Sequence, residues 1–137
     1  MRIETKDRVV VSENTNGIVV SVEVQYQVIY SKPNEGHYVF AYFVTIKNES
    51  PRTVQLLRRH WIIAEEDGIE REVEGPGVIG ETPVLEPGDI HQYESGCPLR
   101  THHGRMWGTY LMQSLPDETE FRVKIPEFKM DVPGMFR

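Results

Sequence analysis

Three glycines, Gly75, Gly77 and Gly80, have the spacing of a phosphate-binding pattern. They lie in the segment EGPGVIGETP, whose core fits G-x-G-x-x-G. In a dinucleotide-binding fold this pattern follows a hydrophobic strand and opens a helix, and the N-terminus of that helix binds the pyrophosphate. The chemistry that the pattern suggests is therefore the binding of a phosphate or a nucleotide.

The residues around the glycines do not suit a nucleotide site. The preceding residues, IEREVE, are polar, and Pro83 follows Gly80 at a depth where proline costs about 3 kcal/mol in a helix. Pro76 has no N–H group to add to a ring of backbone donors around a phosphate. The lysine of a P-loop is also missing after Gly80. We therefore predict that residues 75–83 connect two strands without a helix, with anion binding as the alternative.

The segment RRHW offers a second group of candidates. Arg59 and His60 interrupt an apolar run, and arginine is rarely buried unless it is paired. We expect the partner to be an internal carboxylate, and an external ligand is the alternative. Trp61 is expected to fill the core, as a buried tryptophan does in immunoglobulin-type domains. Arg59 and His60 are thus candidate binding residues, and Trp61 is a candidate core residue.

The histidines and the cysteine do not form a recognisable catalytic or metal-binding motif. His102 and His103 are adjacent, and adjacent side chains in an extended chain point in opposite directions. We therefore expect solvated loop histidines and no metal site. Cys97 has no identifiable base to activate it, so a small buried thiol is the expected state. No catalytic residue and no cofactor are predicted, and the protein is not expected to be an enzyme.

Composition excludes several classes of protein. The chain has 15 basic and 21 acidic residues, a net charge of −6, which argues against a nucleic-acid binder and against attraction to anionic membranes. No apolar stretch approaches the ~18 residues that span a bilayer, and the charged N-terminus does not resemble a signal peptide. A single cysteine cannot form an intrachain disulfide. The sequence indicates one domain in the cytoplasm.

Most of the chain alternates between apolar and polar residues, as half-buried strands do. A run over residues 18–30 is long for one strand, so we expect it to bend or to cross between sheets. Asp67 and Gly68 form a strong hairpin signal, and Pro126 must lie at the end of a strand or on a sheet edge. The other expected strands cover residues 38–48, 54–64, 69–75, 90–95, 105–114 and 121–128. About seven strands predict an all-β sandwich or barrel.

Four blocks in this order, QLLRRHWII, GPGVIGETPVLEPGD, YESG and MWGTYLM, resemble those of the ApaG proteins. The resemblance covers residues 18–128. It implies an immunoglobulin-like, fibronectin type III-like β-sandwich in a bacterial, cytoplasmic protein. The segment KMDVPGMFR after the last expected strand predicts a loose tail over residues 129–137. The glycine pattern of the family corresponds to Gly75, Gly77 and Gly80, and its arginine-histidine-tryptophan block to Arg59, His60 and Trp61.

The function that this resemblance implies is broad. The family is associated with cobalt and magnesium resistance without an established reaction, and related domains in F-box proteins and in a DNA polymerase delta-interacting protein suggest protein binding. We therefore expect a non-enzymatic module that binds another protein, and a homodimer is also open. The alternative is a phosphate or nucleotide sensor that uses the Gly75–Gly80 segment with Arg59 or His60. A second alternative is an indirect role in cobalt and magnesium homeostasis.

Overall fold

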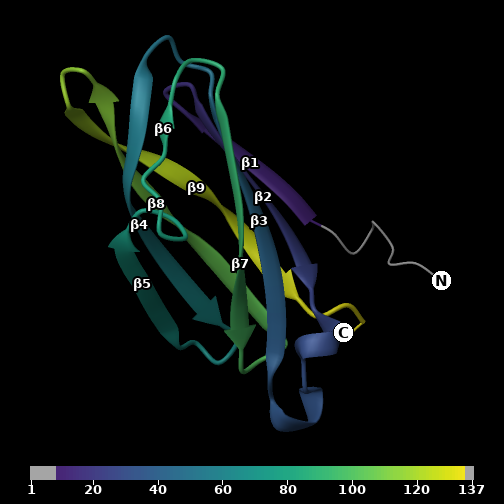
Figure 1. The fold of residues 1–137 in the computed structure, drawn as a ribbon. Coiled ribbons are helices and arrows are strands. Elements are labelled where there is room, and N and C mark those ends of the chain that lie inside the picture. Colours follow the sequence, from purple (N-terminus) through teal and green to yellow (C-terminus); the bar gives the residue numbers. More distant parts are fainter. Residues whose placement is uncertain (1–8, 135–137) are drawn as a thin grey trace.

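The computed structural model describes residues 9–134, which form two antiparallel sheets packed face to face (Figure 1). The first sheet has the order β1 (Val9–Thr15), β2 (Ile18–Tyr26), β3 (Tyr38–Asn48) and β7 (Ile90–Leu99). The second has the order β5 (Glu70–Pro76), β4 (Thr53–Glu65), β8 (His103–Leu115) and β9 (Thr119–Asp131), and the short β6 (Val84–Leu85) pairs with β4. The predicted all-β sandwich is confirmed, and no helix over these residues is long and apolar enough to cross a membrane.

The core lies between the sheets and follows from the alternation in the sequence. Along β3 every second residue is buried, and β2 repeats this pattern from Ile18 to Val24. Trp61 on β4 lies at the centre, with its ring 5.4 Å from the ring of Tyr42 and 5.9 Å from that of Phe128. These contacts are tilted or edge-on, which aromatic pairs prefer to face-to-face stacking. The aromatic cluster joins the two sheets.

Two strands differ from the sequence prediction near the N-terminus. The strand expected over residues 18–30 ends at Tyr26, and Val28–Tyr30 form one turn of 3-10 helix instead. The hydroxyl of Ser31 donates to the Gln27 carbonyl at 2.7 Å and accepts the Val39 N–H at 2.9 Å, so the chain turns back before the strand can continue. In addition, β1 pairs with β2 although the sequence did not indicate a strand there.

The C-terminal segment also differs from the sequence prediction. Strand β9 continues to Asp131, Met130 and Val132 are buried, and the Val132 N–H donates to the His102 carbonyl at 3.0 Å. The prediction of a loose tail is therefore wrong for residues 129–132, because alternate side chains still face the core. Residues 135–137 of that predicted tail lie outside the described residues. Pro126 lies on the edge strand β9, near a shift in the β8–β9 register.

An irregularity in β4 decides which of its side chains face inward. The register between β4 and β8 shifts between Leu56 and Arg58, as a β-bulge produces. Leu56 is buried before the shift, and Trp61 is buried after it. Because one residue is inserted, the inward-facing positions change from even to odd numbers. Arg59 therefore shares the inward face with Trp61.

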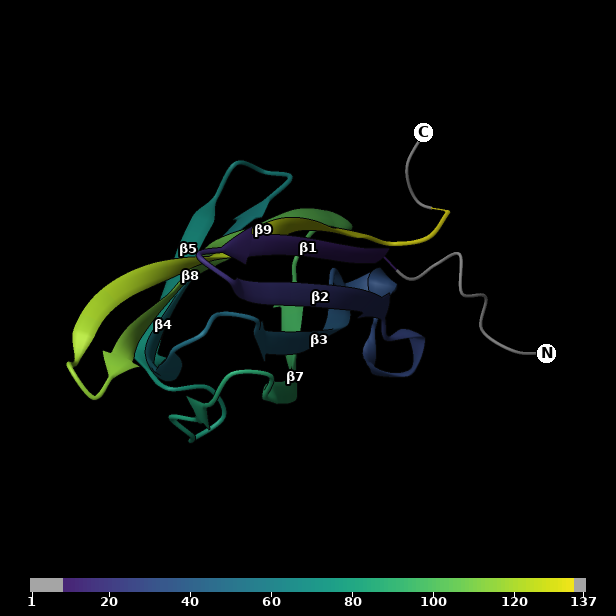
Figure 2. The same cartoon turned by 90° about the horizontal axis from the view of Figure 1, so that it is seen from above.

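The two long edges of the sandwich differ. At one edge β1 lies beside β9, where the Lys124 N–H donates to Thr15 Oγ at 3.2 Å (Figure 2). At the other edge the chain continues from β5 through residues 77–83 to β6, and β7 is the edge strand that pairs with β3. The candidate site lies at this second edge.

Candidate functional site

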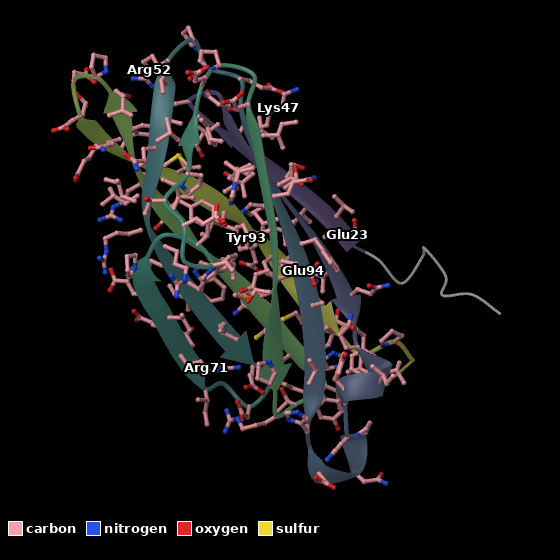
Figure 3. All side chains as sticks on the ribbon, viewed as in Figure 1. Glu23, Lys47, Arg52, Arg71, Tyr93 and Glu94 are labelled. Atoms are coloured by element: carbon pink, nitrogen blue, oxygen red, sulfur yellow. The ribbon has the colours of Figure 1, made fainter. Side chains whose placement is uncertain are left out.

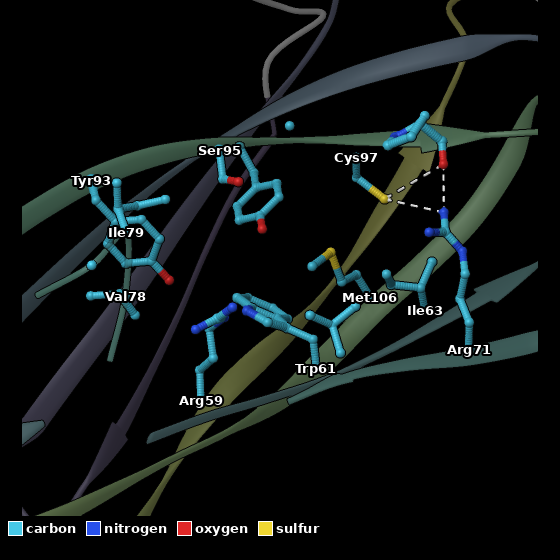
Figure 4. Close-up of a pocket in the computed structure, with 15 residues that line it drawn as sticks. Arg59, Trp61, Ile63, Arg71, Val78, Ile79, Tyr93, Ser95, Cys97 and Met106 are labelled. Atoms are coloured by element: carbon cyan, nitrogen blue, oxygen red, sulfur yellow. Dashed lines mark hydrogen bonds between the residues drawn. The ribbon is translucent and has the colours of Figure 1, made fainter. Parts of the chain in front are cut away.

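A cavity of about 270 Å³ lies between the edge strands β5 and β7 (Figure 4). Tyr93 on β7 and Arg71 on β5 mark its two sides (Figure 3). Its apolar wall comes from the second sheet and from the segment after β5, and consists of Trp61, Ile63, Val73, Val78, Ile79 and Met106. Its polar groups are the side chains of Tyr42, Arg59, Arg71, Tyr93, Ser95 and Cys97. The cavity is thus an apolar chamber with donors on several sides.

The glycine segment forms a tight turn at the mouth of this cavity. Val78 and Glu81 exchange two backbone hydrogen bonds, of 2.8 and 3.0 Å, around Ile79 and Gly80. Both central residues have positive φ, +47° at Ile79 and +76° at Gly80, as a type I′ turn requires. No helix follows, so the predicted strand connection over residues 75–83 is confirmed.

The spacing of the other two glycines has structural causes. Gly77 has φ +62°, and a Cβ there would lie 2.2 Å from the Glu81 carbonyl oxygen. A Cβ at Gly75 would lie 3.2 Å from Nη1 of Arg59, so its absence makes room for the guanidinium. The Gly77 N–H donates to the carbonyl of Leu57, in the β4 bulge, at 2.8 Å. The N–H groups of Gly77, Val78 and Glu81 are therefore already engaged within the protein, and the glycines shape a tight turn.

Arg59 is the cation that the glycine segment holds in place. Its Nη1 donates to the carbonyls of Pro76 at 3.0 Å and Gly77 at 3.1 Å. Among the described residues no carboxylate forms an ion pair with Arg59. The internal salt bridge expected from the sequence is not found among residues 9–134, where two backbone carbonyls orient the guanidinium instead. The positive charge lines the cavity.

Three hydroxyl groups share the cavity with Arg59. Burial raises the pKa of the Tyr42 hydroxyl, an effect that a hydrogen bond with Ser95 partly offsets. Burial also raises the pKa of Tyr93, whose hydroxyl bonds to that of Tyr110. Both tyrosines are therefore neutral at physiological pH and present hydroxyl groups that can donate hydrogen bonds.

At the far end of the cavity, the positive charge of Arg71 is already neutralised by a carboxylate. Arg71 donates to the Pro98 carbonyl and contacts Cys97 Sγ at 3.8 Å (Figure 4). It also lies 3.9 Å from the buried carboxylate of Glu65. Burial raises the pKa of the Cys97 thiol to about 11, so that it stays protonated. The small buried thiol expected from the sequence is confirmed. Arg71 and Arg59 thus differ, because only Arg71 has a carboxylate partner here.

The structure brings together four of the five predicted binding residues. Arg59 contacts or adjoins Gly75 and Gly77, and Gly80 lines the same cavity. His60 is separate, since it follows Arg59 by one position and its Nε2 lies 2.9 Å from Glu72 Oε1 on the outer face.

Sequence reasoning missed the hydroxyl groups and the strained residue at the mouth. Tyr93 and Ser95 alternate with polar residues in IHQYES, so the period of two was a signal for a shared inward face. Ile79 carried no such signal, because its positive φ depends on the turn that surrounds it.

Comparison with known proteins decides the family. The family model described as the ApaG domain matches residues 29–114, more than half of the chain. The chain belongs to the ApaG family. The Protein ApaG of Brucella canis is 50% identical over 123 residues, which cover 90% of this chain and 94% of that protein. The Protein ApaG of Paramagnetospirillum magneticum is 49% identical over 122 residues, covering 89% and 93% of the two chains. A crystal structure of an ApaA protein from Bordetella pertussis has a TM-score of 0.83 and 41% identity, over 86% of this chain and 95% of that one.

The four blocks by which the sequence resembles this family meet at the cavity. They come from β4, from the connection after β5, from β7 and from β8. The residues that they contribute to its lining are Arg59, Trp61, Ile63, Val78, Ile79, Gly80, Tyr93, Ser95, Gly96 and Met106. The fold thus gathers these separate segments around one chamber, which makes the chamber the candidate functional site.

Proposed function

We propose that this protein is a non-enzymatic binding module whose cavity binds a small organic anion at Arg59. The observation that carries the proposal is the guanidinium of Arg59, which lines the cavity and is oriented by two carbonyls without an ion-pair partner among the described residues. A carboxylate or phosphate group would supply the missing negative charge and accept its remaining N–H donors. The hydroxyls of Tyr42 and Ser95 line the same chamber and can donate to the same group.

The size and lining of the cavity favour a ligand with an apolar body. A volume of about 270 Å³ is near the lower end of the ~300–1,000 Å³ range of small-molecule sites, so one compact molecule fits and a dinucleotide does not. Trp61, Ile63 and Met106 offer apolar surface opposite the donors. The lining supplies donors and apolar surface, a combination suited to binding and orienting a ligand.

A set of four probes tests this proposal. Benzoate and phenyl phosphate combine an anion with an aromatic body, benzyl alcohol has the body without the charge, and pyrophosphate has the charge without the body. We expect calorimetry to give at least tenfold tighter binding for benzoate or phenyl phosphate than for benzyl alcohol. If pyrophosphate binds more tightly than both benzoate and phenyl phosphate, the phosphate sensor is favoured instead.

Arg58 provides a matched control for Arg59. The two residues are neighbours on β4, but Arg58 is exposed on the outer face. Arg59→Gln should remove the preference for the charged probes, and Arg58→Gln should leave it unchanged. Equal losses in the two variants would show that the preference comes from overall charge, and equal binding of all four probes would overturn the proposal.

A second candidate function, recognition of another protein, is supported by the exposed tip between β2 and β3. The side chains of Val28, Ile29 and Tyr30 are 71%, 83% and 67% exposed. Contiguous apolar groups with this exposure are uncommon outside interaction sites. Their convex 3-10 turn suits an apolar groove on a partner. The predicted cytoplasmic location and the indirect link to cobalt and magnesium are compatible with either function.

Site-specific photo-crosslinking tests this second candidate. A photoreactive residue at position 29 should yield one discrete adduct in cells, and the same group in place of Ile69 should not. Ile69 is the control because it is also exposed and apolar but lies on the β4–β5 connection. An adduct with a second copy of this chain would indicate a homodimer, and identical adduct patterns at the two positions would refute a role for the tip.

A further inference from the structure

Two histidines and a glutamate come together where the β7–β8 connection meets the β4–β5 turn, apart from the Arg59 cavity. The ring centroids of His102 and His103 are 4.4 Å apart. One ligand atom from each of Glu66, His102 and His103 lies within 4.8 Å of the other two. The divergence expected of adjacent side chains does not apply, because Thr101 and His102 form a bend rather than extended strand.

We infer that Glu66, His102 and His103 form a binding site for a transition-metal ion, with Zn²⁺ as the best-suited common ion. Two imidazole nitrogens and one carboxylate oxygen are a ligand set that zinc accepts, with bonds of about 2.0–2.2 Å. Mg²⁺ is not suited to this set, because it takes oxygen ligands in a strict octahedral arrangement. This inference goes beyond the proposed anion binding and does not depend on it.

The hydrogen bonds around the two histidines favour metal binding. Nδ1 of His103 lies 2.9 Å from Oδ1 of Asp131, the carboxylate–histidine arrangement that orients an imidazole for a metal and places the lone pair on Nε2. Nδ1 of His102 is buried and has no hydrogen-bond partner among the described residues, and it lies 3.8 Å from Oε1 of Glu66. A metal ion between these two groups would satisfy a nitrogen that otherwise carries the penalty of an unmade bond.

The backbone that carries these ligands is held on both sides. Oε1 of the buried Glu65 accepts the N–H groups of Arg100 at 2.7 Å and Thr101 at 3.0 Å, next to His102. The Glu66 N–H donates to the carbonyl of His103 at 3.2 Å, which joins two of the ligand residues directly. Fixed ligand positions reduce the conformational entropy that metal binding would otherwise consume.

The remaining adjustment falls mainly on the most exposed of the three ligands, Glu66. Tetrahedral zinc bonds place ligand atoms about 3.3 Å apart, so the separations here, at most 4.8 Å, must shorten by up to about 1.5 Å. The side chain of Glu66 is half exposed and can rotate toward the histidines. Three protein ligands leave a fourth position for water, and an open groove of about 260 Å³ lined by Glu66, His103 and Asp131 adjoins the site.

Calorimetric titration of the full chain, free of any purification tag that binds metals, tests the inference. We expect one Zn²⁺ per chain and no saturable binding of Mg²⁺. His102→Asn, His103→Asn and Glu66→Gln should each weaken zinc binding at least tenfold. Asp131→Asn keeps all three ligands and should weaken it about 10–100-fold, the usual effect of removing a carboxylate behind a ligating histidine.

His60 is the control, because it pairs with Glu72 as His103 pairs with Asp131 but has no third ligand in the cluster. His60→Asn should leave zinc binding unchanged, and so should Arg59→Gln. Circular dichroism of each variant separates loss of the site from loss of the fold. A wild-type chain that binds no zinc, or folded His102→Asn and His103→Asn variants that bind it as the wild type does, would overturn the inference.

Discussion

The strained turn at the cavity mouth allows a quantitative prediction. Ile79 has φ +47°, a left-handed conformation that is unusual for a β-branched residue. Such a conformation costs about 1–2 kcal/mol per residue for a side chain with a Cβ, and glycine avoids the cost. Ile79→Gly should therefore relieve strain at the same time as it removes apolar contacts. Ile90 is a matched comparison, since it is 55% exposed against 61% for Ile79 and lies at the start of strand β7 without a positive φ.

The two substitutions remove the same side chain from sites of similar exposure. The free energy lost with the buried surface, and that lost to the extra freedom of glycine in the unfolded chain, are then similar at both positions. The backbone strain at Ile79 remains as the difference between the two changes in stability. We expect Ile90→Gly to lower the free energy of unfolding by about 1–2 kcal/mol more than Ile79→Gly does, which is the left-handed cost alone. Urea unfolding of both variants measures this difference. Equal losses at the two positions would refute the claim that Ile79 is strained.

The nearby glycines extend this series in the opposite direction. Gly80 and Gly77 both have positive φ, but a Cβ at Gly80 meets nothing within 4 Å, whereas one at Gly77 would lie 2.2 Å from the Glu81 carbonyl oxygen. Gly80→Ala should therefore lower the free energy of unfolding only by the cost of a left-handed backbone for alanine, about 1 kcal/mol. Gly77→Ala should cost clearly more, because the backbone of Glu81 must also move. The reverse order in the same urea assay would mean that the turn adopts another geometry in solution.

Two further predictions concern the core and the buried thiol. Trp61→Ala should lower the free energy of unfolding by about 3–5 kcal/mol, since Trp61 is buried among aromatic rings of both sheets, and a cooperative wild-type-like melt of this variant would contradict its place in the core. Because burial raises the pKa of Cys97 from its ordinary 9.0 to about 11, its contribution to stability should be present below pH 9 and lost as pH rises toward 11. Burial also raises the pKa values of three tyrosines, Tyr42, Tyr93 and Tyr110, which therefore add further losses of stability above pH 10. Cys97→Ala should remove only the loss of stability that begins near pH 9. An unchanged pH profile of unfolding in that variant would contradict this assignment.

The sandwich could be predicted because its strands bury one face, which imposes a period of two on the sequence. Strand β3 was expected over residues 38–48 and has those bounds, since both neighbours in its sheet cover it. Strand β1 was not expected, because its pairing with β2 depends on contacts that a local pattern does not contain. The end of β2 could not be predicted either. The chain reverses there through two hydrogen bonds of the Ser31 hydroxyl, and a local sequence pattern does not contain these contacts.

The candidate site depended on a single inserted residue. Arg59 interrupts an apolar strand, and local reasoning correctly required a partner for it. That partner could not be identified from the sequence, because the β4 bulge at Leu57 changes which residues face inward and its carbonyl also anchors Gly77. Once Gly77 is fixed there, its own carbonyl and that of Pro76 reach the guanidinium and hold it toward the cavity. The bulge thus turns an arginine that strict alternation leaves unexplained into an oriented charge without an ion-pair partner among the described residues, and the glycine segment supplies the carbonyls that orient it.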